Sequence, residues 1–272
     1  MTDIAKPHLG QGQKNQRLVV RISNRSLSFS TVAAEGISYE PYALNASISL
    51  AANLREALRT TAMSRQRADR TLIMVDSYVL MIPISEFSEE TCEQLYRHAF
   101  SQQEKRVVLY AVLVDLNCVA VFSIEKDVHT VCNDAFANAQ YMPCMAPVWR
   151  HLHQRSYTGG RQKLYGYFHE HRMEVFAFGQ NRFKFCNTFS VNNTNDALYY
   201  LLAVWKQLAM TPESDEMHLV GDIPDRDTLM VEAQKFVKRV FYIKPAGEFN
   251  RAAVTQIDDM PYDLMVLFVK GV

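Results

Sequence analysis

The stretch RLVVRISNRSLSFS, residues 17–30, decides how this chain is organised. Two runs rich in alternating apolar residues flank the polar segment 23–26, which is typical of a β-hairpin with a tight turn. A second stretch, KLYGYFHEHRMEVFAFGQNRFKFCNTF at 163–189, has the pattern of three short strands with turns at 169–172 and 179–182. The hairpin with a following third strand therefore occurs twice, which predicts two halves built on one plan.

Helices and strands alternate through the rest of the chain, so the pattern predicts an α/β protein with mixed α+β elements. Apolar residues at helical or strand spacing give the elements. We expect helices at 47–63, 88–100, 127–137, 148–154, 194–210, 225–239 and after Pro261, and strands at 71–76, 78–83, 106–115, 118–124, 140–145, 217–222 and 240–243.

A composition change divides the chain in two. The only Gly-Gly pair, Gly159-Gly160, lies in the segment RSYTGGRQ (155–162), which has the composition of a hinge or domain junction. We therefore expect a first domain at 17–157 and a second at 158–272. The mixed elements at about 84–145 predict a small subdomain inserted into the first, and the polar start, 1–16, a flexible tail.

Composition narrows the class of partner. Lys plus Arg and Asp plus Glu number 29 each, so no global charge favours nucleic acid or an anionic membrane. No apolar run is long enough to span a bilayer, and the start has no secretion signal. The five cysteines are odd in number and widely spaced, which favours reduced, mostly buried thiols in a cytoplasmic protein over a disulfide or zinc framework.

Three motifs resemble the actin-like ATPase superfamily, which includes actin, Hsp70-type chaperones, sugar kinases and bacterial pilus-assembly and secretion proteins. LVVRISNRSLSFS matches the first phosphate loop, LYGYFHEHRMEVFAF the second, and HLVGDIPDRDTL the adenosine loop. With EFNRAAVTQIDDMPYDLMVLF near the end, the chain more closely resembles a bacterial family of unknown function that is typical of Bacteroidetes. The resemblance covers about 17–270 and implies two ribonuclease-H-like halves with a cleft between them.

Active members of the superfamily carry Asp, Gly and Thr in both hairpin turns, where the acids organise magnesium and the glycines let backbone N–H groups approach phosphate. Here the first Asp position falls on Arg21. The glycine position falls on Ser23, which is followed by Asn24 and Arg25. The resemblance therefore implies a first phosphate loop without its metal-binding acid.

The second loop departs in the same way. Its Asp position falls on Tyr167, and its glycine turn is His169-Glu170-His171-Arg172. Glu170 is a candidate replacement for the lost carboxylate, and Arg172, with Arg21 and Arg25, would lie near the mouth of the cleft, where arginines are able to hold a phosphate in a bidentate manner. Ordinary surface charge at turns is the simpler interpretation. Only the third motif keeps a likeness, in Gly221 and Asp222.

Other candidate sites are weaker. Two H-x-H pairs, at 151/153 and 169/171, raise the question of zinc, but neither has an evident carboxylate or thiol to complete a ligand set, so we expect no metal. Asp76 and Asp115 end strands, where both catalytic acids and turn residues occur. The aromatic strand faces, which contain Phe176, Phe178, Phe183 and Phe185, favour core packing over base stacking.

The first hypothesis is a non-catalytic scaffold on an actin-like ATPase fold, a pseudo-ATPase that binds a protein partner through the inserted subdomain or the cleft and needs no cofactor. The alternative is an ATPase or kinase that binds Mg·ATP with replaced ligands. The missing acids and glycines favour the scaffold. Partner identity and assembly into a homo-oligomer are left open by the sequence.

Overall fold

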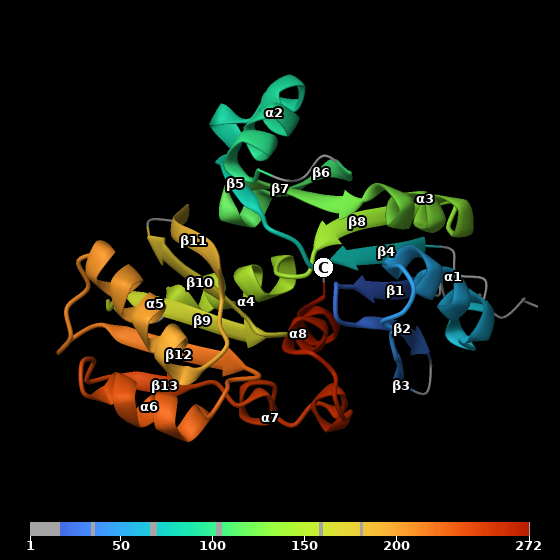
Figure 1. Cartoon of the computed structure of the whole chain (residues 1–272). Helices are drawn as coiled ribbons and strands as arrows, with labels where there is room; N and C mark the ends of the chain where they lie inside the picture. The colour runs from blue at the N-terminus through green and yellow to red at the C-terminus, as the bar shows by residue number, and fades with distance from the viewer. Residues whose placement is uncertain are drawn as a thin grey trace, which may run out of the picture.

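A computed structural model describes residues 17–33, 36–65, 70–101, 105–157, 160–179 and 182–271. Figure 1 shows two lobes side by side, a smaller sheet above them, and two helices, α4 and α8, in the region between. The expected tail, 1–16, lies outside the described residues, as does Gly159 of the Gly-Gly pair. Within the described part of the chain, no helix has the length and apolar character needed to cross a membrane.

The first lobe is a five-stranded sheet in the order β3-β2-β1-β4-β8. The hairpin expected at 17–30 is present: β1 and β2 pair antiparallel, whereas β4 pairs with both β1 and β8 in parallel. The strands are β1 (Arg17–Ile22), β2 (Leu27–Ala33), β3 (Gly36–Tyr42), β4 (Arg70–Val75) and β8 (Ala139–Pro143). Helices α1 (Leu50–Thr60) and α3 (Lys126–Ala135) bury their apolar faces with one face of this sheet.

The second lobe repeats the plan. Its sheet has the order β11-β10-β9-β12-β13, which corresponds strand for strand to the first, and again three antiparallel strands are followed by two parallel ones. The strands are β9 (Lys163–His169), β10 (Arg172–Gly179), β11 (Arg182–Ser190), β12 (Glu216–Gly221) and β13 (Val240–Tyr242), and the helices are α5 (Thr194–Gln207), α6 (Arg226–Gln234) and α7 (Pro245–Glu248). The repeated plan predicted from the two hairpin openings is thus present in the fold.

The third sheet is small, with the order β5-β7-β6, and lies above the lobes with α2 (Figure 1). It comprises β5 (Leu80–Pro83), α2 (Glu89–Ala99), β6 (Arg106–Leu113) and β7 (Cys118–Glu125). The range expected for the inserted subdomain, 84–145, does not match this sheet. It begins after β5 and includes α3 and β8, which belong to the first lobe because β8 pairs with β4 and α3 packs on the core of that lobe.

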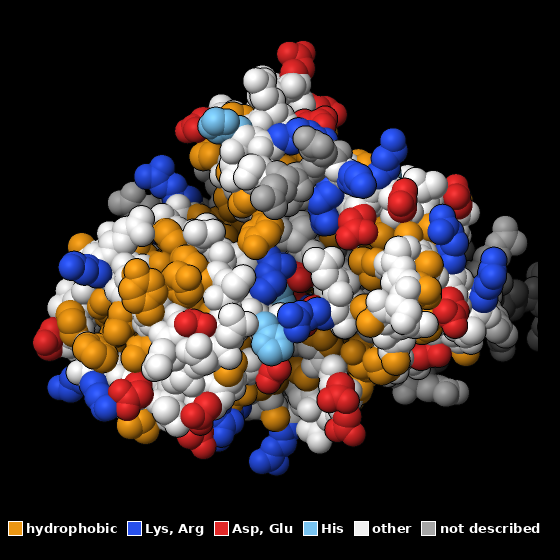
Figure 2. Space-filling view, in the orientation of Figure 1, with side chains coloured by type: hydrophobic (Ala, Val, Ile, Leu, Met, Phe, Trp, Pro, Cys, Tyr) orange, Lys and Arg blue, Asp and Glu red, His pale blue; other side chains and the backbone are white. Residues whose placement is uncertain are grey.

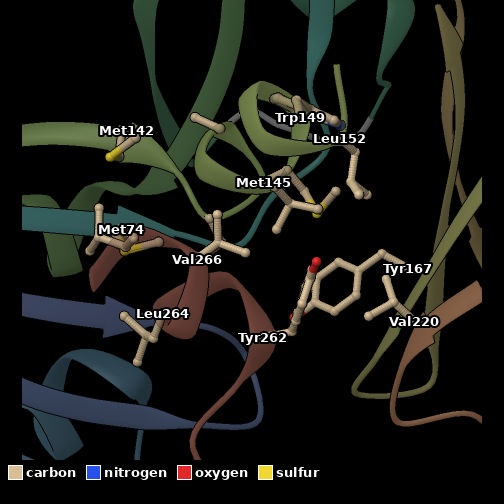
Figure 3. Close-up of a cluster of buried hydrophobic side chains, with 14 of the residues drawn as sticks. Met74, Met142, Met145, Trp149, Leu152, Tyr167, Val220, Tyr262, Leu264 and Val266 are labelled. Atoms are coloured by element: carbon tan, nitrogen blue, oxygen red, sulfur yellow. The ribbon is translucent and has the colours of Figure 1, made fainter. Parts of the chain in front are cut away.

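Two helices fill the space between the lobes. Helix α4 (Ala146–Ser156) and helix α8 (Tyr262–Lys270) pack on each other, and one apolar cluster joins them to the facing sides of both sheets. In Figure 3 this cluster includes Met74 of the first sheet, Trp149 of α4, Leu264 of α8, and Tyr167 of the second sheet. The terminal helix predicted after Pro261 is therefore a shared core element, which explains why its sequence is apolar on every side.

Candidate functional site: the cleft between the lobes

Arg21 lies at the bottom of the cleft because of its position in β1. Strand residues alternate between two faces. Leu18, Val20 and Ile22 pack against the α1/α3 side of the sheet, whereas Val19 faces the cluster that contains α4 and α8. Arg21 shares the face of Val19 and is only 1% exposed. A guanidinium buried in this way needs a counter-charge and hydrogen-bond acceptors.

Asp263, in the first turn of α8, supplies the counter-charge. Arg21 Nε donates to Asp263 Oδ1 at 3.0 Å, Nη2 donates to Oδ2 at 3.0 Å, and the carboxyl is fully buried. The hydroxyl of Tyr167 donates to the same Oδ2 at 3.1 Å. Burial by itself lowers the pKa of Arg21, but the Asp263 carboxylate outweighs it and holds that pKa well above its ordinary value. Arg21 therefore keeps its positive charge although it is buried.

Glu170 joins the two hairpin turns. It lies in the β9–β10 turn with a positive φ of 47° and reaches the β1–β2 turn. Glu170 Oε1 accepts from Arg21 Nη1 at 3.0 Å and from Ser26 Oγ at 2.6 Å, and Oε2 accepts from Ser23 Oγ at 2.6 Å. Burial favours the neutral acid, but the charge of Arg21 and the hydroxyl donors outweigh it, so the pKa of Glu170 is lowered. We call Arg21, Asp263, Glu170, Ser23 and Ser26 the Arg21 cluster.

A second ion pair joins the lobes nearby. Arg172, at the start of β10, donates from Nη1 to both oxygens of Asp76, which follows β4, at 3.0 and 3.1 Å. Its guanidinium carbon lies 4.7 Å from the centre of the Tyr78 ring. The pKa of Arg172 is raised because Asp76, and then Glu174, outweigh the effect of burial. Asp76 is thus an ion-pair partner across the cleft.

The other predicted residues divide into two groups. Arg21, Ser23, Glu170 and Arg172 take part in contacts between the lobes. Asn24 and Arg25 lie exposed at the tip of the β1–β2 turn, and among the described residues neither side chain has a hydrogen-bond or ion-pair partner. Figure 2 shows basic and acidic side chains gathered where the two lobes meet.

Gly221 ends β12, Asp222 follows it, and both line the cleft from the second lobe. Gly221 has a φ of +96°, and a Cβ there would lie 2.1 Å from the carbonyl oxygen of Phe168. The backbone N–H of Asp222 donates to that same oxygen at 2.9 Å. The glycine is therefore required by the close approach of β9, while the Asp222 side chain is exposed.

A cavity of about 520 Å³ remains in the cleft. It is lined by Arg21, Ser26, Tyr39, Tyr167, Phe168, His169, Glu170, Gly221, Asp222, Tyr242, Pro245, Asp259, Met260, Pro261, Tyr262 and Met265. Three carboxylates and one guanidinium are among the lining groups, and that guanidinium is already paired with Asp263 behind the wall. The cavity is therefore predominantly acidic and aromatic.

The histidines of the two H-x-H pairs differ in their surroundings. His151, on α4, lies 2.9 Å from Glu248 Oε1, and His153 lies 3.0 Å from the hydroxyl of Tyr157. His169 is buried and His171 is exposed. Among the described residues, no group of three or more His, Cys, Asp or Glu side chains is placed to hold a metal ion.

The sequence interpretation missed Asp263, the residue that pairs with Arg21. One signal was available: Asp263 is the only charged residue in the apolar run MPYDLMVLFV at 260–269. A single acid in a buried helix requires a buried cation, and Arg21 is the single cation in the apolar run LVVRI at 18–22. Asp115, the other strand-end acid, pairs with Arg150 at 3.0 Å. Phe176 and Phe178 are buried in the core, as expected.

The sequence matches the model of the family described as "Protein of unknown function (DUF3822)" over residues 10–240. The chain belongs to this family. A comparison with curated proteins gives no match.

Comparison with solved structures shows the fold of this chain. A Bacteroides thetaiotaomicron VPI-5482 protein, described as having an actin-like ATPase fold and unknown function, is 30% identical, with a TM-score of 0.80 over 90% of this chain and 97% of that one. A structure of the PilM–PilN type IV pilus biogenesis complex aligns with a TM-score of 0.53 at 11% identity, over 93% of this chain and 96% of that one. This DUF3822 chain therefore has the actin-like ATPase fold.

Gly221→Ala should lower the free energy of unfolding by about 2 to 5 kcal/mol, because backbone strain adds to the clash with Phe168. Gly247→Ala is the matched control, since a Cβ at Gly247 in α7 meets nothing within 4 Å. That change should be neutral or stabilising by up to about 1 kcal/mol. Urea unfolding of the two variants checks this, and equal effects would show that β9 does not approach Gly221 as described.

Asp263→Asn should lower the free energy of unfolding by about 3 to 5 kcal/mol, because it leaves the Arg21 charge buried without a counter-charge. Lys235→Met, which removes an exposed pair with Glu232, is the control and should cost less than about 1 kcal/mol. The double variant Arg21→Met/Asp263→Leu should recover part of the loss. If Asp263→Asn costs no more than Lys235→Met in urea unfolding, the pair is not a structural requirement.

Proposed function

We propose that this DUF3822 protein is a non-catalytic scaffold, a pseudo-ATPase that uses the actin-like fold to bind a protein partner. One observation carries the proposal: Arg21, at the position where active members of the fold have a metal-organising Asp, is buried in an ion pair with Asp263. The side chain that should hold magnesium and its water is thus a cation that joins β1 to α8.

The geometry of the two turns supports this proposal. Phosphoryl transfer depends on magnesium held close to phosphate and on backbone N–H groups that approach it. Tyr167, at the second Asp position, uses its hydroxyl to bind Asp263. Glu170, the candidate replacement acid, already accepts hydrogen bonds from Arg21, Ser23 and Ser26. Neither turn therefore offers a free carboxylate oxygen and an open backbone together.

The charge of the cavity also opposes a nucleotide. Glu170, Asp222 and Asp259 line it, and the one lining guanidinium has its charge matched by Asp263. A triphosphate would enter a site of its own sign, with unfavourable Coulomb energy at each short separation. Asp222 and Asp259 line the cavity but do not belong to the Arg21 cluster. They are therefore the acids that remain available to a magnesium ion, and the ones that a test should change.

The alternative function is a nucleotide-dependent ATPase or kinase with other ligands. It is favoured by one observation, a cavity of about 520 Å³ at the cleft, which falls in the usual range for small-molecule sites. Mg·ATP is the cofactor that this alternative requires.

Two further points support a protein-binding role. One structural neighbour is described as a complex of PilM with PilN, so a protein with this fold can function through a protein partner. All five cysteines are free, as expected for a protein of a reducing compartment, and we propose that the protein acts in the bacterial cytoplasm. The partner in such a scaffold role could also be a second copy of this chain.

Calorimetric titration with Mg·ATP, together with a phosphate-release assay, tests the proposal. The expected result is no magnesium-dependent binding in the micromolar range and no phosphate release above the buffer rate. Micromolar, magnesium-dependent binding with turnover that Asp222→Ala abolishes would establish the enzyme instead. Asp227→Ala, at an exposed acid on α6 outside the cavity, is the control and should leave any turnover unchanged.

A further inference from the structure

Two arginines lie side by side at the opposite end of the first sheet from the Arg21 cluster. Arg17 begins β1, Arg70 begins β4, and the two residues are register partners in the parallel pair. Burial, and then the charge of Arg70, lower the pKa of Arg17. In the part of the chain that the structure describes, neither side chain has a carboxylate partner. Holding two like charges together costs free energy that a bound anion would recover.

The two arginines line a cavity of about 490 Å³, which we call the arginine groove. Its remaining lining residues are Leu72, Ala111, Val112, Leu113, Gln140, Tyr141, Met142 and Arg150. Arg150 is itself paired with Asp115 at 3.0 Å, so among the described residues Arg17 and Arg70 are the lining cations without a carboxylate partner. The groove thus combines basic side chains with a mixed polar and apolar lining, in which Leu72, Leu113 and Met142 are buried.

Strands that end two different sheets form the walls of the groove. Strand β8 is the last strand of the first sheet, and β6 is the last strand of the small sheet, so each has one paired side and one unpaired side among the described strands. Val112, in the groove lining, is 48% exposed, and Val114, just after β6, is 75% exposed. Unpaired strand edges readily accept an added strand from another chain.

We propose that the arginine groove binds an extended, acidic segment of another protein, with its carboxylates on Arg17 and Arg70 and its backbone along the strand edges. This inference rests on the scaffold function proposed above and names the surface and the chemistry of the partner. The groove favours protein over nucleic acid because the positive charge is confined to two side chains and the chain as a whole is neutral. Apolar side chains of the segment would pack on Ala111 and Val112, the apolar lining residues that remain accessible.

Fluorescence anisotropy with a labelled eight-residue peptide that alternates Glu and Val tests the proposal on the full chain. We expect saturable binding in the micromolar range that weakens as salt rises. A peptide with Gln in place of every Glu should bind at least tenfold more weakly. Equal binding of the two peptides would overturn the proposal, as would the absence of saturable binding of the Glu peptide at low salt.

Variants locate the site. Arg70→Gln should weaken binding of the Glu peptide about tenfold, and Arg17→Gln should do the same. Arg55→Gln, the same change at an exposed arginine on α1, is the matched control and should leave binding unchanged. Thermal unfolding of Arg70→Gln should show an unchanged or raised midpoint, because a repulsion has been removed. A reduced midpoint with unchanged peptide binding would overturn both the charge argument and the site.

Two competitors identify the ligand class. Inorganic phosphate and a labelled single-stranded DNA of twelve nucleotides should bind at least tenfold more weakly than the peptide, and tight DNA binding that Arg70→Gln abolishes would replace the protein segment by nucleic acid. The two proposals fail separately. If neither the peptide nor Mg·ATP binds, the groove proposal is rejected and the scaffold proposal stands. Magnesium-dependent turnover rejects the scaffold proposal, and the effect of the arginine variants on peptide binding then decides the groove proposal by itself.

Discussion

The buried ion pair between Arg21 and Asp263 is the interaction on which the rest of the cleft depends. Arg21 belongs to the first lobe, and Asp263 to the helix packed between the lobes. Removing two charges from water is costly, and their attraction offsets that cost only when both groups are fully hydrogen-bonded. Tyr167 and Glu170 complete the hydrogen bonding from the second lobe. Any movement of the lobes that broke these hydrogen bonds would leave the buried charges without partners. The ion pair, together with Tyr167 and Glu170, therefore favours the observed arrangement of the lobes.

This arrangement differs from the one that the resemblance to active actin-like ATPases implies. In active members the two hairpin turns face a nucleotide, whereas here Glu170 joins them directly through Ser23 and Ser26. Arg172 and Asp76 add a second contact between the lobes a short distance away. A cleft fixed in this way is suited to present surfaces, such as the arginine groove, in a constant geometry, and that property is useful in a scaffold.

Much of the fold could be predicted from the sequence, because a hairpin pattern begins at residue 17 and again at residue 163, which indicates two halves with the same order of strands and helices. The limits of the inserted subdomain could not, since helix α3 and strand β8 have ordinary local patterns and only pairing with β4 assigns them to the first lobe. The candidate site was predicted in part. Arg21 and Glu170 were identified from their positions. Asp263 lies 242 residues from Arg21, and the local patterns show only that each is a lone charge in an apolar run, not that the two residues meet.

The central claim is that the Arg21 cluster holds the lobes in one arrangement that nucleotide does not change. Its most direct test is the distance between spin labels on the two lobes, at Arg55→Cys on α1 and Tyr199→Cys on α5, measured by electron–electron double resonance with the half-buried Cys186 changed to Ser. The account predicts one narrow distance distribution that Mg·ATP leaves unchanged and that Asp263→Asn broadens. A shift of the distribution on addition of Mg·ATP to the labelled protein that retains Asp263 would contradict it.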